Sequence, residues 1–294
     1  MSSPTPVPAT SVPIFGIDRV QRLQTMDMSS LSDWRCYQME AGRVTAFIAF
    51  LFTAAAVLYS IRAAKTRMPN IRRIAGLDAI EEAVGRATET GKPLFYTTGT
   101  ADITGSYAAN IFAGLEILGH TSRIVARNNA DMIVGISLPN VYPLALQMVE
   151  EGYLYAGKHE YFNPEIIRFL SPTQFAYASG CMGLIQREKA AATLMLGHFM
   201  AEAILLAEAS SQVGAISIAG MTSMAQLPFL IAACDYTLIG DELLVAGAYL
   251  AQDPVKMGSI AGQDWAKLLG FVLIAAGSIM ATAGSKWLQD LLSF

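Results

Sequence analysis

The sequence predicts a membrane-anchored α/β protein, with a three-layer domain that contains a parallel or mostly parallel sheet and is flanked by two transmembrane helices. Two stretches, 44–61 and 268–285, contain no charged residue over 18 positions each. As helices they would cover roughly 27 Å, close to the ~30 Å hydrocarbon thickness of a bilayer. Between them, short apolar runs alternate with helical patterns, which is typical of βαβ units. A mean hydropathy of +0.40 also fits one globular domain with a few membrane spans.

These observations divide the chain into six segments. They are an extended or amphipathic N-terminal segment (1–43), a transmembrane helix (44–61), a basic juxtamembrane linker (62–73), a cytoplasmic α/β domain (74–267), a transmembrane helix (268–285) and a C-terminal tail (286–294). The N-terminal segment lacks the pattern of a secretory signal peptide. For the last apolar stretch, an interfacial helix or a buried final helix of the domain remains an alternative to a membrane span.

Charge predicts the orientation of the domain. Five cations and no acidic residue follow the first apolar stretch directly, namely Arg62, Lys65, Arg67, Arg72 and Arg73. Because Lys and Arg concentrate on the cytoplasmic side of a span, we expect the domain to face the cytoplasm from the inner (cytoplasmic) membrane of a cell. The lipid bilayer is then a partner, since these cations can hold anionic headgroups.

The domain itself is acidic, with 10 Lys and Arg against 19 Asp and Glu. Such a net charge of −9 repels a phosphate backbone, so nucleic acid is excluded as a partner. The cysteines Cys36, Cys181 and Cys234 lie far apart and form no CxxC motif. We expect them to be free thiols in a reducing compartment, with neither a disulfide framework nor a metal centre.

Small residues recur on one face of each apolar stretch. They are Ala46, Ala49, Thr53, Ala56 and Ser60 in the first, and Gly270, Gly277, Ala281 and Gly284 in the second. Small residues let helices approach closely in lipid, which favours a two-helix membrane stem or an oligomeric bundle. The alternative is that alanine and glycine are simply common in membrane spans.

Within the domain, the first elements are an amphipathic helix over 77–90 ended by Gly91, a strand over 93–98, and a helix over 107–127 capped by Asp102. The following elements repeat this alternation. We expect a strand at 131–137, a helix at 141–158, a strand at 165–170, a helix from Thr173, a long helix at 189–211, a strand at 215–220 and a helix at 243–252 capped by Asp241 and Glu242. The uncharged run 209–234 is too polar for a span and is expected to form a buried strand, a loop and a helix, with a re-entrant segment as the alternative.

Four strings, at 79–89, 174–177, 226–229 and 234–242, resemble an uncharacterised prokaryotic family of membrane-anchored proteins that is known only as a domain of unknown function. The resemblance covers roughly residues 74–285. It implies no activity, cofactor or catalytic residue, and the cofactor therefore stays unknown.

The loop 97–106 is the best candidate ligand-binding segment. It contains Thr97, Thr98, Thr100 and Asp102. In open parallel sheets, ligands bind beyond the carboxyl ends of the strands, and this loop follows a predicted strand and leads into a helix. It has neither the GxGxxG nor the Walker spacing, so a simple turn with a helix cap remains the alternative.

Three further residues carry chemistry that a site could use: His198, Glu202 and Asp235. His198 and Glu202 are four apart in a predicted helix over 194–208, which would place both on one face. A buried, hydrogen-bonded structural pair is the alternative, as is helix capping for the acidic residues near 235–242. Because the sequence has no GxSxG elbow and no metal-ligand motif, no metal and no catalytic residue is assigned.

Two functional hypotheses remain. The first is a non-enzymatic membrane protein that self-associates as a homo-oligomer, or serves as a subunit of a membrane complex. The second is a membrane-associated enzyme or small-ligand-binding protein that uses the loop 97–106 with His198, Glu202 or Asp235. Convergence of these side chains would favour the second hypothesis.

Overall fold

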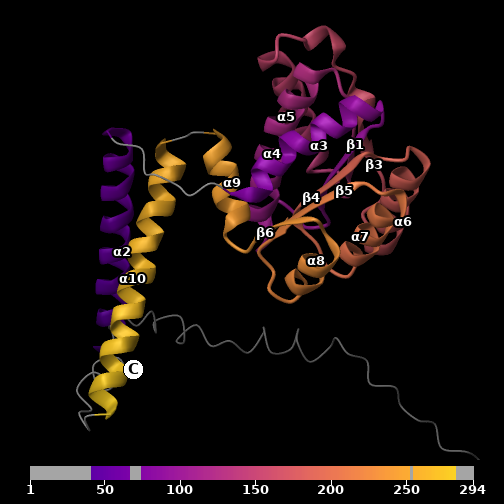
Figure 1. The fold of residues 1–294 in the computed structure, drawn as a ribbon. Helices are drawn as coiled ribbons and strands as arrows, with labels where there is room; N and C mark the ends of the chain where they lie inside the picture. Colours follow the sequence, from indigo (N-terminus) through magenta and orange to yellow (C-terminus); the bar gives the residue numbers. More distant parts are fainter. Residues whose placement is uncertain (1–40, 67–73, 252–253, 283–294) are drawn as a thin grey trace, which may run out of the picture. The chain divides into compact units, whose positions relative to one another are not determined.

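A computed structural model describes residues 41–66, 74–251 and 254–282 (Figure 1). The longer helices are α2 (Ala41–Thr66), α3 (Ala75–Thr90), α4 (Ala108–Asn128), α5 (Tyr142–Tyr155), α6 (Gln174–Arg187), α7 (Glu202–Val213), α8 (Leu227–Ala233), α9 (Glu242–Ala251) and α10 (Pro254–Thr282). The strands are β1 (Leu94–Gly99), β2 (Met132–Ile136), β3 (Ile167–Phe169), β4 (Ala192–His198), β5 (Ile216–Met221) and β6 (Tyr236–Ile239). Two 3-10 turns, His159–Tyr161 and Pro164–Ile166, precede β3.

The strands form one six-stranded sheet in the order β3-β2-β1-β4-β5-β6. Every neighbouring pair is parallel, with Tyr96 of β1 opposite Val134 of β2 on one side and Leu194 of β4 on the other. The predicted α/β class and parallel sheet are thereby confirmed. A parallel sheet needs a crossover between successive strands, and the helices supply these crossovers on both faces.

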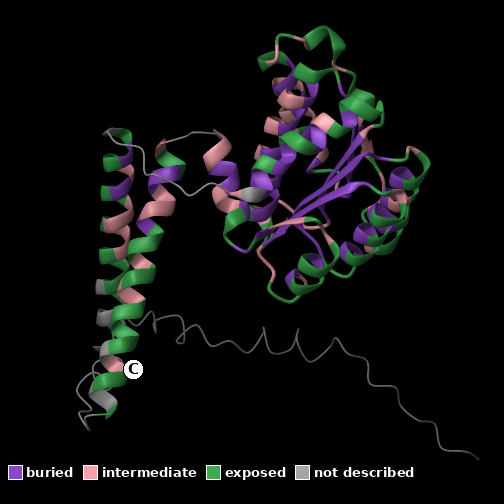
Figure 2. Ribbon diagram, in the orientation of Figure 1, coloured by how far each residue is buried: buried purple, intermediate pink, exposed green. Residues whose placement is uncertain are grey.

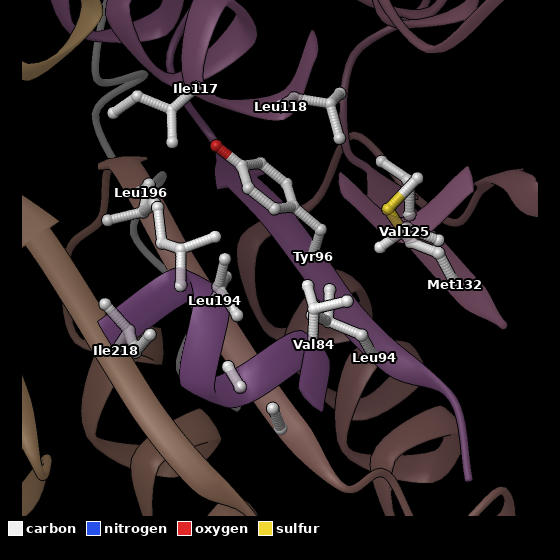
Figure 3. Close-up of a cluster of buried hydrophobic side chains, with 14 of the residues drawn as sticks. Val84, Leu94, Tyr96, Ile117, Leu118, Val125, Met132, Leu194, Leu196 and Ile218 are labelled. Atoms are coloured by element: carbon white, nitrogen blue, oxygen red, sulfur yellow. The ribbon is translucent and has the colours of Figure 1, made fainter. Parts of the chain in front are cut away.

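Two apolar layers pack against opposite faces of the sheet. Figure 2 shows the buried residues of the strands and of the helices that cover them. Successive strand residues point to opposite faces. Tyr96 therefore joins the layer of α3, α4, α5 and α9, whereas its neighbour Phe95 joins the layer of α6, α7 and α8. Figure 3 shows Tyr96 among Leu94, Leu194 and Ile117. Each fully buried aliphatic side chain contributes about 1.5–3 kcal/mol to folding, so these layers stabilise the domain from both sides.

The prediction of a long helix over 189–211 is wrong. Residues 192–198 form β4, all of them buried, and α7 begins only at Glu202. A central parallel strand is covered on both faces, so its sequence is continuously apolar and lacks the two-residue alternation that marks a half-buried strand. The short strand β6 was also missed, and the predicted strand over 165–170 reduces to Ile167–Phe169 after a 3-10 turn.

Most other predicted elements are confirmed with small shifts in their ends. Helix α3 ends where Gly91 adopts a left-handed conformation, with φ +63°. The run 209–234 contains the buried strand β5 and the helix α8, as expected. Helix α9 is also confirmed, but the Asp241 carboxylate pairs with the Lys267 ammonium at 2.7 Å, and only Glu242 bonds to the backbone near the start of the helix, at the Ile239 N–H.

The first apolar stretch is helical in α2, and the described part of the second, 268–282, is helical in α10. Among the described residues, however, only Pro254–Ile279 of α10 is long and apolar enough to cross a membrane. Most side chains of this segment are exposed, as for Phe271 at 73% of its surface, which differs from a core helix of a soluble domain. The expected pair of transmembrane helices is thus found in part, as one candidate.

Two glycines outside the predicted small-residue stripe determine how closely α10 packs on α2. A Cβ added to Gly258 would lie 2.6 Å from Ile61 Cα, and one added to Gly262 would lie 2.6 Å from Val57 Cα. These two glycines form a GxxxG spacing, which lets helix backbones approach closely. By contrast, a Cβ at Gly270 would meet nothing within 4 Å, so this part of the predicted stripe is open.

Candidate functional site

The carboxyl ends of β1 and β4 mark the point where the strand order reverses. From this point the chain leaves β1 into α4, which covers one face of the sheet, and leaves β4 into α7, which covers the other. Because the two connections diverge, open sheets of this order have a crevice at the switch point, and ligands bind there. The predicted loop 97–106 and His198 both lie at this edge.

Glycines bring the ends of β1 and β4 unusually close together. Gly99 has φ +86°, and a Cβ added to it would lie 1.9 Å from the His198 carbonyl oxygen. A Cβ added to Gly197 would lie 2.1 Å from the Thr98 carbonyl oxygen. The Thr100 N–H donates to the His198 carbonyl at 3.1 Å, which joins the loops after the two strands. Any larger residue at either glycine would push these loops apart.

Glu202 begins α7 and is completely buried. Its Oε1 accepts a hydrogen bond from the Thr100 hydroxyl at 2.8 Å, and its Oε2 accepts one from the Gln174 amide at 2.5 Å. Both donors are neutral. None of the ion pairs found among the described residues includes Glu202. A buried carboxylate without a cation is costly to fold, which is typical of a site that something else completes.

His198 ends β4 and is only 3% exposed. Its ring stacks on that of Tyr107, with centroids 3.7 Å apart and planes 14° from parallel. Neither ring nitrogen has a hydrogen-bond partner. Burial lowers the pKa of His198, and the nearby Glu202 charge opposes this effect in part. A neutral imidazole therefore offers one unused donor and one unused acceptor.

A second unpaired group follows the neighbouring strand. Gln226, five residues after the end of β5, has a buried Oε1 without a partner. Asn110, buried in the first turn of α4, donates to the Thr222 hydroxyl at 2.6 Å and so joins this helix to the loop after β5. Sequence reasoning missed Tyr107, Gln226 and Asn110. The available signal was that each lies in a segment just beyond the carboxyl end of a strand.

The remaining predicted residues of the loop have structural roles. The Thr97 hydroxyl bonds with the Tyr177 hydroxyl and accepts the Gly99 N–H at 3.2 Å, while Thr98 is buried. Asp102 does not cap α4. Its Oδ1 accepts the Thr104 N–H at 2.8 Å and the Asn140 amide at 2.8 Å. Hydrogen bonds, first of all that from the Thr104 N–H, lower the pKa of Asp102.

Asp235 does not belong to this site. It precedes β6 at the amino-terminal edge of the sheet, where its Oδ2 accepts the Ser217 N–H at 2.8 Å and the Ser217 hydroxyl at 2.9 Å. A cavity of about 270 Å³ beside it is lined in part by Arg86. A larger one, about 810 Å³, lies beside the edge strand β3, between α5 and α6. Neither cavity is lined by His198 or Glu202.

Of the five predicted headgroup ligands, Arg62 and Lys65 are exposed in the last turns of α2. Arg67, Arg72 and Arg73 lie outside the described residues, as does Cys36. Cys181 and Cys234 are free thiols, the first buried and the second half-buried. Within the described part of the chain, no three His, Cys, Asp or Glu side chains gather in a way that would hold a metal ion.

Comparison with curated proteins and comparison with solved structures each found no match. One family model matches residues 35–292, which is most of the chain and extends beyond the region of the resemblance noted from the sequence. The chain therefore belongs to the family described as "Domain of unknown function (DUF6754)".

Proposed function

We propose that this protein is a membrane-tethered α/β protein that binds a small molecule at the switch point between β1 and β4. The observation that carries this proposal is the meeting of Thr100, His198 and Glu202, which lie up to 102 positions apart in the sequence. His198 contributes two buried nitrogens without partners. Buried polar groups are rarely left unsatisfied, so a ligand would supply the hydrogen-bond partners that these nitrogens lack.

The proposal assigns binding and no reaction. Cys181 is buried in α6, on one face of the sheet. Burial raises the pKa of its thiol to about 12, so it is a poor nucleophile. The Thr100 hydroxyl donates to Glu202, and His198 stacks on Tyr107 near the Glu202 charge. These groups can orient a ligand through hydrogen bonds and stacking, as polar groups do in small-molecule sites.

The tether in this proposal consists of two helices in the membrane, with the domain in the cytoplasm. Its support is the exposed apolar surface of α10 and of α2, where Phe50 is 66% exposed. The cations at the end of α2, Arg62 and Lys65, support a cytoplasmic domain through the excess of positive charge on that side. Anionic headgroups are then their partners.

Membership in a membrane complex, or self-association, is a second candidate function. Helix α8 exposes Phe229 at 52% and Ile231 at 47%, and Met224 before it is 71% exposed. A group of large apolar side chains on a domain surface is a common mark of a protein interface. Crosslinking in native membranes is expected to give a product larger than the monomer, and a monomer alone would count against this candidate.

Thermal unfolding of the full chain in detergent tests ligand binding. A panel of amines, amino acids, sugars, nucleosides and nucleotides is screened for compounds that raise the Tm, because ligands stabilise the state that binds them. We expect at least one compound to raise the Tm of the wild type and not that of His198→Phe. His159→Phe is the matched control, since His159 is exposed and its partners, Glu150 and the Phe162 ring, lie outside the site.

If His198→Phe does not fold, His198→Gln replaces it. A panel in which every stabilising compound acts equally on wild type and both His198 variants would contradict the proposal.

A further inference from the structure

The charge at the carboxyl edge of the sheet restricts the ligand that the proposed function requires. All the loops at this edge lie in the described part of the chain, at 100–107, 137–141, 170–173, 199–201, 222–226 and 240–241, and none contains Lys or Arg. Acidic residues are present in these loops or just after them, namely Asp102, Glu202, Asp241 and Glu242. Of these, Asp241 is paired with Lys267. The edge is therefore negative around the switch point.

Glu202 places an unbalanced negative charge at the switch point itself. It is fully buried, and its two hydrogen bonds come from the neutral Thr100 hydroxyl and Gln174 amide. Neutral donors satisfy part of the hydrogen-bonding capacity of a carboxylate but do not cancel its charge, and a buried unpaired charge destabilises a fold. A ligand that carries positive charge would supply the missing partner.

The two rings beside Glu202 suit the same kind of ligand. Burial lowers the pKa of His198, so the ring is neutral and keeps a lone pair that can accept an N–H from a cation. Tyr107 is stacked on His198 and is 45% exposed. The outer face of its phenol ring can attract a cation through the negative charge of the π system.

Nucleotide binding, the usual role of this strand order, lacks its required groups here. The loop after β1 has no GxGxxG spacing, and Asp102 in this loop would repel a phosphate. The residue that follows β2 is Ser137, where a dinucleotide site has an acidic residue for the ribose, and the Ser137 hydroxyl already donates to the Ser171 carbonyl at 3.0 Å.

We propose that the switch-point site binds a small organic cation, a molecule with a primary amine or guanidine group, through Glu202, His198 and Tyr107. This inference rests on the proposed function and gives it a ligand class. Glu202 balances the charge of the ligand, and His198 accepts one of its N–H groups. Tyr107 attracts the ligand through the outer face of its ring.

Thermal unfolding of the full chain in detergent at 0.15 M salt tests the inference, with agmatine and putrescine as cationic probes. AMP, NAD and inorganic phosphate are the anionic probes. At about 100-fold excess over its Kd, a bound probe raises the Tm of a domain of this size by roughly 5–10 °C. We expect this rise for a cationic probe and for none of the anionic ones.

Variants locate the binding. Glu202→Gln keeps the shape of the side chain and is expected to weaken binding of the cationic probe roughly 30-fold or more, because it removes one partner of a buried charge pair. Glu208→Gln is the matched control, since Glu208 lies on the same helix, is exposed and carries the same charge. Asp102→Asn, at an exposed carboxylate, serves if Glu202→Gln fails to fold and should give a smaller loss in the same direction.

The outcomes separate this inference from the proposed function. Equal stabilisation of wild type, Glu202→Gln and Asp102→Asn by the cations would show non-specific attraction to an acidic protein and would overturn the inference. An anionic or neutral compound that acts through His198 while no amine or guanidine does so would also overturn it, but would leave the site in place. If no compound in the wider panel acts through His198, both proposals fail.

Discussion

Two glycines in the middle of helices should respond in opposite directions when each is replaced by alanine. Gly85 of α3 has nothing within 4 Å of an added Cβ. At Gly114 of α4, an added Cβ would lie 2.3 Å from the Leu196 carbonyl oxygen and 3.5 Å from Thr98 Cγ2. Both positions gain the same intrinsic helix stability from alanine, about 0.5–1 kcal/mol. The difference between them therefore measures how tightly α4 lies on the sheet.

The magnitude at Gly114 follows from the distance. A carbon and a carbonyl oxygen normally stay about 3.3 Å apart, so α4 must move away from β4 by about 1 Å. Such overpacking costs about 1–3 kcal/mol. The movement also stretches the buried hydrogen bond from the Tyr96 hydroxyl to the Gly114 carbonyl, 2.6 Å long, whose loss adds about 1–3 kcal/mol. After the helix gain is subtracted, Gly114→Ala should destabilise the fold by about 3 kcal/mol.

Thermal unfolding of the full chain in detergent measures both effects. With about 2–4 °C for each kcal/mol, Gly85→Ala should raise the Tm by roughly 1–4 °C, and Gly114→Ala should lower it by roughly 6–12 °C. The double variant should show the sum, because the two sites share no close contact. Stabilisation by Gly114→Ala, or equal changes at both positions, would refute the close approach of α4 to the carboxyl ends of β1 and β4.

Three further predictions concern titration, thiol chemistry and helix packing. Burial lowers the pKa of His198 and His120 in the fold, so the unfolded chain binds their protons at a higher pH than the folded chain does. The free energy of unfolding should therefore be constant above about pH 6.5 and decrease as the pH falls below it. A free energy of unfolding that does not change between pH 7.5 and 5.5 would exclude this effect. Burial raises the pKa of Cys181 to about 12 and that of Cys234 to about 11. Iodoacetamide at pH 8, with the labelled peptides identified afterwards, should therefore modify either thiol only after denaturation. Rapid labelling of Cys181 in the native protein would contradict its burial. A Cβ at Gly262 would lie 2.6 Å from Val57 Cα, so Gly262→Leu should push α10 away from α2 and lower the Tm. Gly270→Leu is the control, because nothing lies within 4 Å of a Cβ added there, and equal effects of the two substitutions would contradict the packing of α10 on α2.

Amphipathic elements were predictable because their patterns are local. The face of Leu77, Ile80 and Val84 has the helical period and packs in the core as α3. Strand β4 was not predictable in the same way, because Thr193–Gly197 is apolar without a period and both conformations suit it. Its assignment to a helix placed His198 and Glu202 on one helical face, whereas they actually lie on either side of a strand-to-helix turn.

Some residues of the candidate site could likewise be selected from the sequence, and others could not. The loop 97–106 could be selected because a polar, glycine-containing segment after a buried strand is where parallel sheets bind ligands. Asp235 was selected on residue type, but the start of β6 places it at the opposite edge of the sheet. Gln174 could not be selected, since nothing in its neighbourhood in the sequence shows that its amide bonds Glu202.

Local patterns of hydrophobicity and charge were thus enough to establish the α/β class, the parallel sheet, the apolar helices near both ends and the acidic character of the domain. These properties depend on neighbouring residues, through helix and strand periods and the transfer of apolar surface from water. The order of the strands decided which residues meet at the candidate site. By placing β4 beside β1, it brought Thr100 to Glu202 across 102 positions and buried His198 beneath Tyr107. Contacts of this kind depend on how the whole chain packs, and no local pattern encodes them.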